Sequence, residues 1–195
     1  MTETIEVSYP RALAVADGDV DLRCMNAGDE GAILDFARAL APHDLLFMRR
    51  NISEPKVVAA WTKEALAGNL TTLLAIRRGL IVGCMAIVRD ELSWSPHVGE
   101  LRLLVATQMR GKGLGRALTQ HSFAVALSLG LEKLMAYMTV DQRGAIAVFE
   151  GLGFQAEAVL REHVKDLKNV KHDVAVLSFD VAKYFGRMQA LGVVA

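Results

Sequence analysis

The chain has 195 residues, of which 52% are hydrophobic, and this length is enough for one domain with a substantial buried core. Its 22 basic and 22 acidic side chains balance to a formal charge of zero, so no overall field favours binding to nucleic acid or to an anionic membrane. No apolar run approaches the roughly 18 residues that cross a bilayer, and residues 1–7 carry acids where a secretory signal has basic residues, so we expect a cytoplasmic protein.

The first part of the chain is predicted to hold a lead-in, one strand and two helices. Residues 1–18 show no clear period, which indicates a loosely ordered segment. Residues 20–25 favour a strand, and Asp29 and Ser53 are placed to cap the two helices that follow. The connection between these helices, residues 43–51, is predicted to be an unusually apolar loop.

The rest of the chain alternates between strand and helix signals. Residues 70–76 and 80–88 are rich in β-formers and are joined by a basic turn, which predicts a hairpin. The further elements are expected as strand 98–105, helix 114–129, strand 131–140, helix 143–152, strands 154–164 and 174–179, and a short helix over 181–191. This order predicts a mixed α/β fold in which helices interrupt a partly antiparallel sheet.

The stretch from Met109 to Leu118, M-R-G-K-G-L-G-R-A-L, is a cationic, glycine-dense turn that leads directly into a predicted helix. Glycine lets a ligand approach the backbone closely, and the first N–H groups of a helix have no partner within the helix. The helix dipole adds partial positive charge at the same place. These features predict a site for a phosphate-bearing ligand, formed by Arg110, Gly111, Lys112, Gly113, Leu114, Gly115 and Arg116.

Two common phosphate loops do not fit this stretch. A nucleotide-binding P-loop needs G-x-x-x-x-G-K followed by Ser or Thr, and the chain has no such run. A dinucleotide fingerprint needs G-x-G-x-x-G with an acid about 20 residues further on, whereas the glycines here alternate as G-x-G-x-G. The sheet that precedes the glycine turn is also predicted to be built from hairpins, whereas in a Rossmann unit the glycine turn follows the first strand.

The motifs and their order resemble the GCN5-related N-acetyltransferase (GNAT) superfamily. Its acetyl-CoA loop reads Arg or Gln, two residues, Gly, one residue, then Gly or Ala, and Arg110 to Gly115 match it. The strand 100–105 lies five residues upstream, as in that family, and A-I-A-V-F-E-G-L-G-F from Ala145 to Phe154 matches a second family segment. The resemblance covers roughly residues 21–180.

The resemblance implies a GNAT fold over residues 19–182, with a mixed, mostly antiparallel central sheet of about seven strands flanked by about four helices. Residues 183–195 are then expected to form a C-terminal helix and tail. In that family the fourth strand diverges from the fifth at a β-bulge, and pantetheine fills the gap like an added strand.

The resemblance also implies how acetyl-CoA is held. The pyrophosphate would lie over the backbone amides from Arg110 to Arg116, and the pantetheine and thioester would bond the main chain of Leu103, Leu104 and Val105. A main-chain amide aimed at the thioester carbonyl would stabilise the oxyanion. Where the family often has an asparagine that helps to hold CoA, this chain has Gln142, and a longer amide is still able to bond pantetheine. No metal is expected, because the histidines lack ligands at metal spacing.

The sequence offers more than one candidate for the residues that transfer protons. Glu100 begins the strand that leads to the cofactor, where many relatives place a base; it is also spaced to pair with Arg102 as a structural salt bridge. His97 is the alternative base. The position that often holds a tyrosine general acid is Phe149, which has no proton to donate, so Tyr137 on the neighbouring strand is the substitute candidate.

Two functions from different classes follow from the resemblance. The first is an acetyl-CoA-dependent N-acetyltransferase in which a primary amine attacks the thioester directly in a ternary complex, with the acceptor undecided between a protein lysine and a small molecule. The second is a non-catalytic acyl-CoA sensor or interaction module, which Phe149 and Gln142 favour. The expected partners are acetyl-CoA and an amine, without nucleic acid or membrane, and a homodimer is one open oligomeric state.

Overall fold

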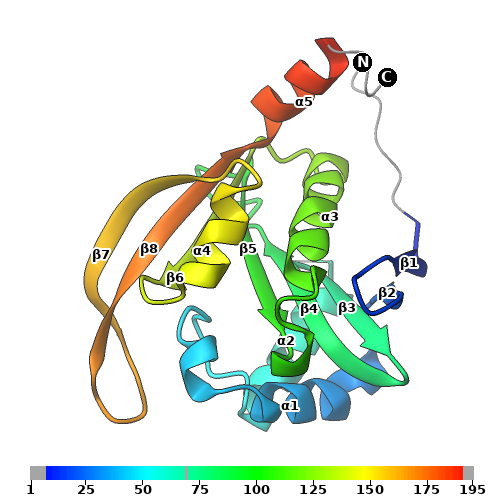
Figure 1. Cartoon of the computed structure of the whole chain (residues 1–195), viewed down its shortest axis with the longest axis vertical. Helices are drawn as coiled ribbons and strands as arrows, with labels where there is room; N and C mark the ends of the chain where they lie inside the picture. Colours follow the sequence, from blue (N-terminus) through cyan, green and yellow to red (C-terminus); the bar gives the residue numbers. More distant parts are fainter. Residues whose placement is uncertain (1–7, 69, 191–195) are drawn as a thin grey trace.

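The computed structural model describes residues 8–68 and 70–190, which build one eight-stranded sheet flanked by helices (Figure 1). The strands follow the order β1-β2-β3-β4-β5-β6-β8-β7, and only β5 and β6 run parallel within it. The strands are β1 (Arg11–Leu13), β2 (Val20–Cys24), β3 (Leu70–Arg77), β4 (Leu80–Val88), β5 (Val98–Val105), β6 (Lys133–Thr139), β7 (Gln155–Lys165) and β8 (Lys171–Asp180).

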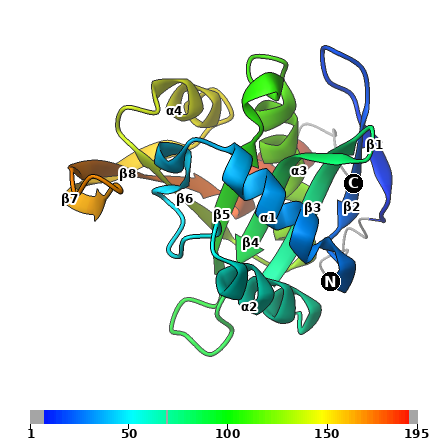
Figure 2. The same ribbon diagram turned by 90° about the horizontal axis from the view of Figure 1, so that it is seen from below.

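The described residues also form five α-helices and three short 3-10 helices; all but α5, which follows the last strand, lie between strands. They are η1 (Ala27–Asp29), α1 (Glu30–Ala39), η2 (Pro42–Leu45), α2 (Pro55–Leu66), η3 (Thr107–Met109), α3 (Leu114–Ser128), α4 (Arg143–Glu150) and α5 (Val181–Ala190). Seen from below, α1 and α2 cover one face of the sheet while α3 and α4 lie on the other (Figure 2). The mixed, mostly antiparallel sheet predicted from the sequence is thereby confirmed.

The central strands β3 and β4 are apolar along their length because helices bury both of their faces. On the α3 face, Gly83 lets the helix come close: a Cβ at that position would lie 3.1 Å from Leu118 and 3.2 Å from Leu114. On the other face, Trp61 of α2 donates from Nε1 to Thr72 Oγ1 at 3.0 Å, which satisfies two buried polar groups.

The described sheet has one strand more than the expected number of about seven, because Arg11–Leu13, inside the segment expected to be a loosely ordered lead-in, pairs with β2 as β1. A three-residue strand is too short for an alternating pattern to be visible in the sequence. Helix α5, beside the four helices expected around the sheet, continues directly from β8 where a short helix over residues 181–191 was expected. Residues 1–7 of the lead-in and 191–195 of the tail lie outside the described residues.

Of the two expected helix caps, one is right in position. Asp29 is the N-cap residue of α1, but its carboxylate makes no capping hydrogen bond there; it accepts from Asn26 N at 2.8 Å and pairs with Arg23. Asn26 caps the one-turn helix before α1, accepting from Gly28 N at 2.8 Å. Helix α2 starts at Pro55, and Glu54, not Ser53, occupies its N-cap position. Among the described residues, no helix is long and apolar enough to cross a membrane. The cytoplasmic location and the homodimer stay predictions.

The feature of the fold that positions the site is the early end of the β5–β6 ladder. The two strands pair from Val98 with Lys133 to Leu101 with Ala136, yet β5 continues to Val105 and β6 to Thr139. The strands therefore diverge inside the sheet. The divergence expected from the resemblance is confirmed, but β5 keeps an unbroken register with β4, so the predicted bulge is absent from that ladder.

Candidate active site

A cleft of about 820 Å³ occupies the gap between β5 and β6. Its surface is mostly apolar, with polar groups gathered at the glycine loop and at the end of β6. It is lined by β5 and β6, by the loop before α3, by the start of α4, and by the segment between α1 and α2. A cavity of this size inside the sheet is large enough for an extended ligand.

The main chain of β5 offers hydrogen bonds to this cleft. Ala106 N donates to Val82 O of β4 at 2.9 Å, and the orientation of successive residues alternates along an antiparallel strand. Since the register is unbroken, Leu104 also directs its main-chain groups to β4. Leu103 and Val105 direct theirs to the other side, where β6 has already moved away. Of the three residues predicted to bond the ligand through their backbone, two face the gap with their N–H and C=O groups.

The glycine loop has the backbone that an anion site requires. Gly111 and Gly113 have φ values of 72° and 86°, in the left-handed region that side chains disfavour. Gly113 is the N-cap of α3, so the unpartnered N–H groups of the first turn begin just after it. Gly115 lies in that turn and lines the cleft, above Leu103 and Val105 of β5. The predicted loop is therefore in contact with the predicted strand.

The three basic residues of the loop differ in what they face. Arg110 and Arg116 line the cleft, whereas Lys112 is not part of the lining. Arg110 donates from Nη2 to Asp44 Oδ2 at 2.6 Å, and Lys112 pairs with Asp17 at 2.5 Å. The positive charge of Arg110 is thus already directed at a carboxylate on η2, and that of Lys112 is directed away from the cleft.

Helix α4 forms the opposite wall. Gln142, just before its first residue, lines the cleft and accepts from Thr139 N through Oε1 at 3.2 Å. This bond fixes the amide and leaves its NH2 group as a donor. Phe149 also lines the cleft, is buried, and packs edge-on against Phe154 with ring centroids 4.8 Å apart.

Glu100 sits in an ion-pair network outside the cleft lining. Its Oε1 accepts from Arg102 Nε at 2.7 Å, as the structural interpretation predicts, and its Oε2 accepts from Arg49 Nε at 3.0 Å. The guanidinium of Arg49 also lies 5.9 Å from the ring centroid of Tyr137, a cation–π contact. Both oxygens of the predicted base therefore already have arginine partners.

The other two proton-transfer candidates occupy different places. Tyr137 on β6 lines the cleft. His97 is exposed in the loop before β5, at the end of that strand away from the gap, and is not in the lining. The structure thus brings the CoA loop, Gln142 and Tyr137 together around one cavity, and leaves Glu100 and His97 outside it.

One pair of residues at the cleft was missed by sequence reasoning. His43 of η2 pairs through Nε2 with Asp141 Oδ2 at 2.8 Å and lies 3.3 Å from Thr139 Oγ1. A hydrogen bond from the Thr139 side chain, together with the nearby His43 ring, lowers the pKa of Asp141 below its ordinary value. Both residues line the cleft. Their separation in the chain left no local signal, although Asp141 directly follows the predicted strand.

Comparison with models of protein families shows to which family the chain belongs. Residues 35–154, more than half of the chain, match the model of the acetyltransferase (GNAT) family. The chain belongs to the GNAT acetyltransferase family. The matched region contains the segment between α1 and α2, the divergent strands, the glycine loop and α4.

Individual GNAT relatives are more distant. The N-acetyltransferase family 8 member 3 of Mus musculus is 32% identical over 84 residues, which cover 42% of this chain and 37% of that protein. The mycothiol acetyltransferase of Thermobispora bispora is 34% identical over 147 residues, which cover 69% of this chain and 46% of that protein. This chain thus spans less than half the length of either relative.

The fold is shared with solved acetyltransferase structures. A putative acetyltransferase from Salmonella typhimurium, solved with its cofactor acetyl-CoA, superposes with a TM-score of 0.70 at 18% identity. The alignment covers 83% of this chain and 94% of that one. At this level of identity the similarity concerns the fold.

Proposed function

We propose that the protein is an acetyl-CoA-dependent N-acetyltransferase that moves the acetyl group to a primary amine by direct attack in a ternary complex. The observation that carries the proposal is the gap between β5 and β6, which leads from the main chain of Leu103 and Val105 to the glycine loop at the start of α3. An extended thioester with a pyrophosphate at one end has the shape and the hydrogen-bonding groups for this path. The acetyl-CoA bound to the Salmonella structure of the same fold supports this choice of donor.

Each part of the cleft has a role in this proposal. The amides from Arg110 to Arg116 hold the pyrophosphate, and Arg110 and Arg116 add positive charge. Leu103 and Val105 bond the pantetheine, and one of their amides stabilises the oxyanion of the tetrahedral intermediate. Gln142 donates its NH2 group to the pantetheine. The side chain of Leu104 is buried and packs in the hydrophobic core.

Proton transfer needs a base for the amine and, optionally, an acid for the departing thiolate. Tyr137 is the candidate acid, supported by its place in the cleft. The thiolate is a good leaving group, so the reaction does not require this donor. Glu100 and His97 are the candidate bases from the sequence; because neither lines the cleft, each would act through intervening water.

We place the entrance of the acceptor amine at η2, where His43 lines the cleft and its ring contacts His172 of β8. The relatives and fold neighbours carry different names, among them a mycothiol acetyltransferase, a putative phosphinothricin acetyltransferase and a spermidine N-acetyltransferase crystallised with CoA and spermine. The proposed acceptor is therefore either a small-molecule amine or a protein lysine.

A second candidate function is a non-catalytic acyl-CoA-binding module. It is favoured by Phe149 at the position of the frequent tyrosine acid and by the two arginines that occupy Glu100. Such a protein would bind acetyl-CoA without transferring the acetyl group.

One experiment separates the two functions. Binding of acetyl-CoA is measured by titration calorimetry, and release of free CoA thiol is then followed with a panel of polyamines, amino acids, aminoglycosides and lysine peptides. Thiol release that depends on an amine, with mass spectrometry showing the acetylated product, supports the enzyme. Tight binding without turnover of any amine in the panel favours the binding module, and no binding contradicts both.

A further inference from the structure

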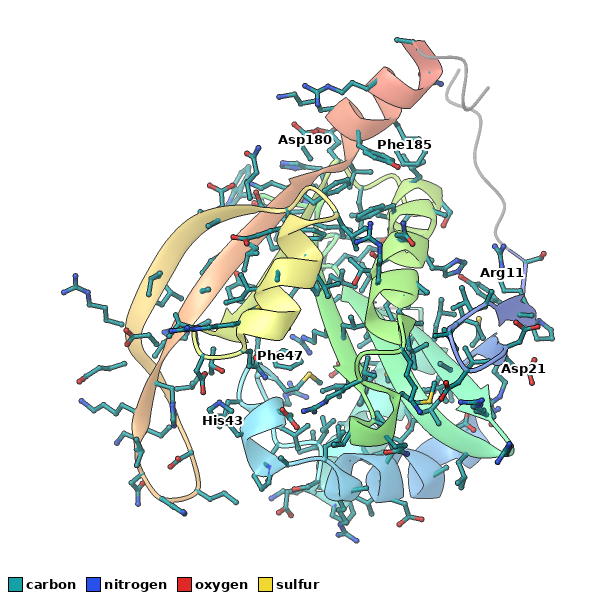
Figure 3. All side chains as sticks on the ribbon, in the orientation of Figure 1. Arg11, Asp21, His43, Phe47, Asp180 and Phe185 are labelled. Carbon is teal, nitrogen blue, oxygen red and sulfur yellow. The ribbon has the colours of Figure 1, made fainter. Side chains whose placement is uncertain are left out.

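His43 and Asp141 join the two elements that border the acceptor side of the cleft. His43 lies in η2, between α1 and α2, and Asp141 follows the last residues of β6. Figure 3 labels His43 where the segment between α1 and α2 approaches the β7–β8 hairpin. The contact of its ring with His172 of β8, at 5.0 Å between centroids, confirms this placement. The imidazole therefore stands at the meeting point of the three elements around the acceptor entrance.

The hydrogen bonds of His43 fix which nitrogen is available. Its Nε2 lies 2.8 Å from the Asp141 carboxylate, which only accepts hydrogen bonds when ionised. Because the pKa of Asp141 is lowered, that carboxylate is ionised at neutral pH, so Nε2 carries the proton. In the neutral ring, Nδ1 is then an unprotonated acceptor. This tautomer is the one that a general base requires.

Several charged and polar groups surround the His43 ring. Asp141 supplies a negative charge in direct contact, and Thr139 adds a polar group 3.3 Å away. His172 faces the ring from β8, and its own Nε2 lies 3.2 Å from Asp166 at the hairpin tip. Asp44, the next residue in η2, is directed to Arg110 instead. Arg143, at the start of α4, is a cationic group of the same cleft lining, as are Arg110 and Arg116 of the glycine loop.

We propose that His43 is the catalytic base of this site and that Asp141 is its positioning residue. The inference rests on the proposed acetyltransferase function. Compared with Glu100, whose oxygens both accept from arginines, and His97, which lies outside the cleft, His43 lines the cleft and has an acceptor nitrogen. Its side chain is 34% exposed, so a proton that it accepts is passed on to solvent directly.

In the proposed acetyl transfer the acceptor loses two protons, one to His43 and one to the CoA thiolate. The acceptor ammonium gives one proton to His43 Nδ1, and the imidazolium is stabilised by Asp141. The amine lone pair then forms a bond to the thioester carbonyl carbon, and the oxyanion collapses with breaking of the C–S bond. The electron pair leaves on sulfur as the CoA thiolate, which takes the second amine proton, so that the products are an amide, CoA thiol and one proton released from His43 to water.

The test compares His43→Ala, His43→Gln and Asp141→Asn with the unaltered protein. The assay uses whichever amine of the panel gives the highest turnover. A general base contributes about 10²–10⁴-fold, so we expect kcat/KM to fall by about that factor in both His43 variants. The rise of kcat/KM with pH should disappear, while Kd for acetyl-CoA changes by less than about threefold. We expect Asp141→Asn to lower kcat/KM by about tenfold or more, because the ring tautomer is no longer fixed.

Two further measurements separate catalysis from structure. Added imidazole should restore part of the activity of His43→Ala and none of that of a merely unstable protein. His163→Gln, at an exposed histidine of β7 outside the cleft lining, is the matched control and should keep full activity. If the His43 variants keep kcat/KM within about threefold and the same pH profile, the assignment of His43 is wrong while the acetyltransferase function stands. If the unaltered protein turns over no amine, both are wrong.

Discussion

Arg110 of the glycine loop donates to the Asp44 carboxylate of η2 at 2.6 Å, and both residues line the cleft. The pair links the donor side of the site to the segment that borders the acceptor entrance. A pyrophosphate bound to the loop, as proposed, would therefore compete with Asp44 for the same guanidinium.

Replacing Asp44 by Asn should tighten the binding of CoA. Removal of the competing carboxylate frees Arg110, and a partly exposed ion pair of this kind is worth about 0–1 kcal/mol, so we expect Kd to fall by about two- to fivefold. Titration calorimetry at low and moderate salt measures the effect, which should be smaller at moderate salt. Asp17→Asn removes the carboxylate beside Lys112, outside the cleft, and should leave Kd unchanged. Weaker binding in Asp44→Asn would contradict the competition.

Replacing Gly115 by Leu should weaken CoA binding without harming the fold. The loop motif admits Gly or Ala at this position, and a Cβ has room, since the nearest atoms are 3.7 Å away on Val105 and 3.9 Å away on Leu103. The larger leucine side chain enters the cleft where the backbone would approach the pyrophosphate, so we expect Kd for CoA to rise at least about tenfold while Tm is kept.

The matched control for this change is Gly31→Leu in α1, where a Cβ meets nothing within 4 Å. Leucine is favoured over glycine inside a helix by up to about 1 kcal/mol, so both variants should be about as stable as the original protein. Gly31→Leu should bind CoA normally. Equal affinity in the two variants would exclude the loop as the pyrophosphate site.

Replacing Glu100 by Gln should mainly reduce stability. Its carboxylate is 13% exposed and holds both Arg49 and Arg102, and a removed charged partner costs about 1–3 kcal/mol. For a chain of this size Tm should fall by roughly 2–4 °C for each kcal/mol. We expect kcat/KM to decrease by less than about tenfold, with the pH profile retained. A loss of more than about a hundredfold together with a flattened pH profile would instead identify Glu100 as the base.

The stability of the protein should decrease below neutral pH because of His121. This residue is 8% exposed, its Nε2 accepts from the Tyr9 hydroxyl at 2.7 Å, and burial, helped by the charge of Arg11, lowers its pKa to about 4. Between the unfolded value of 6.5 and about 4, unfolding takes up a proton, so the free energy of unfolding falls as the pH falls. The whole effect is at most about 3 kcal/mol.

Urea unfolding between pH 4 and pH 8 measures this dependence. In His121→Gln the amide oxygen still accepts from Tyr9, but nothing titrates at this position, so the same series should be flatter over that range. An unchanged slope in the variant would show that other groups control the acid sensitivity.

The parts of the site that were predictable from the sequence are contiguous in the chain. The glycine loop, the strand leading to it and the segment from Ala145 to Phe154 each carry their signal within a few residues, and the order of elements gave the fold class. The pairing of Glu100 with Arg102 was equally accessible, because alternate strand residues share a face.

What could not be predicted depends on contacts between distant segments. Arg49 reaches Glu100, and His43 reaches Asp141, only after the connection between α1 and α2 folds across the end of β6. The sequence also suggested that Lys112 faces the ligand, whereas Asp17 in the loop after β1 attracts it elsewhere. A side chain that is adjacent to a binding motif in the sequence does not necessarily face the ligand.

The short β5–β6 ladder divides the sheet into two half-sheets, β1–β5 and β6–β8–β7, that share only the pairs between Val98 and Leu101 on one side and Lys133 and Ala136 on the other. One hydrophobic core still spans both halves, with Leu101 and Leu134 buried at the short ladder that joins them. A thioester that spans the gap would act as a removable ninth strand. The donor substrate would then serve as mechanical reinforcement as well as a reactant, and the enzyme would be most rigid at the moment when an acceptor arrives.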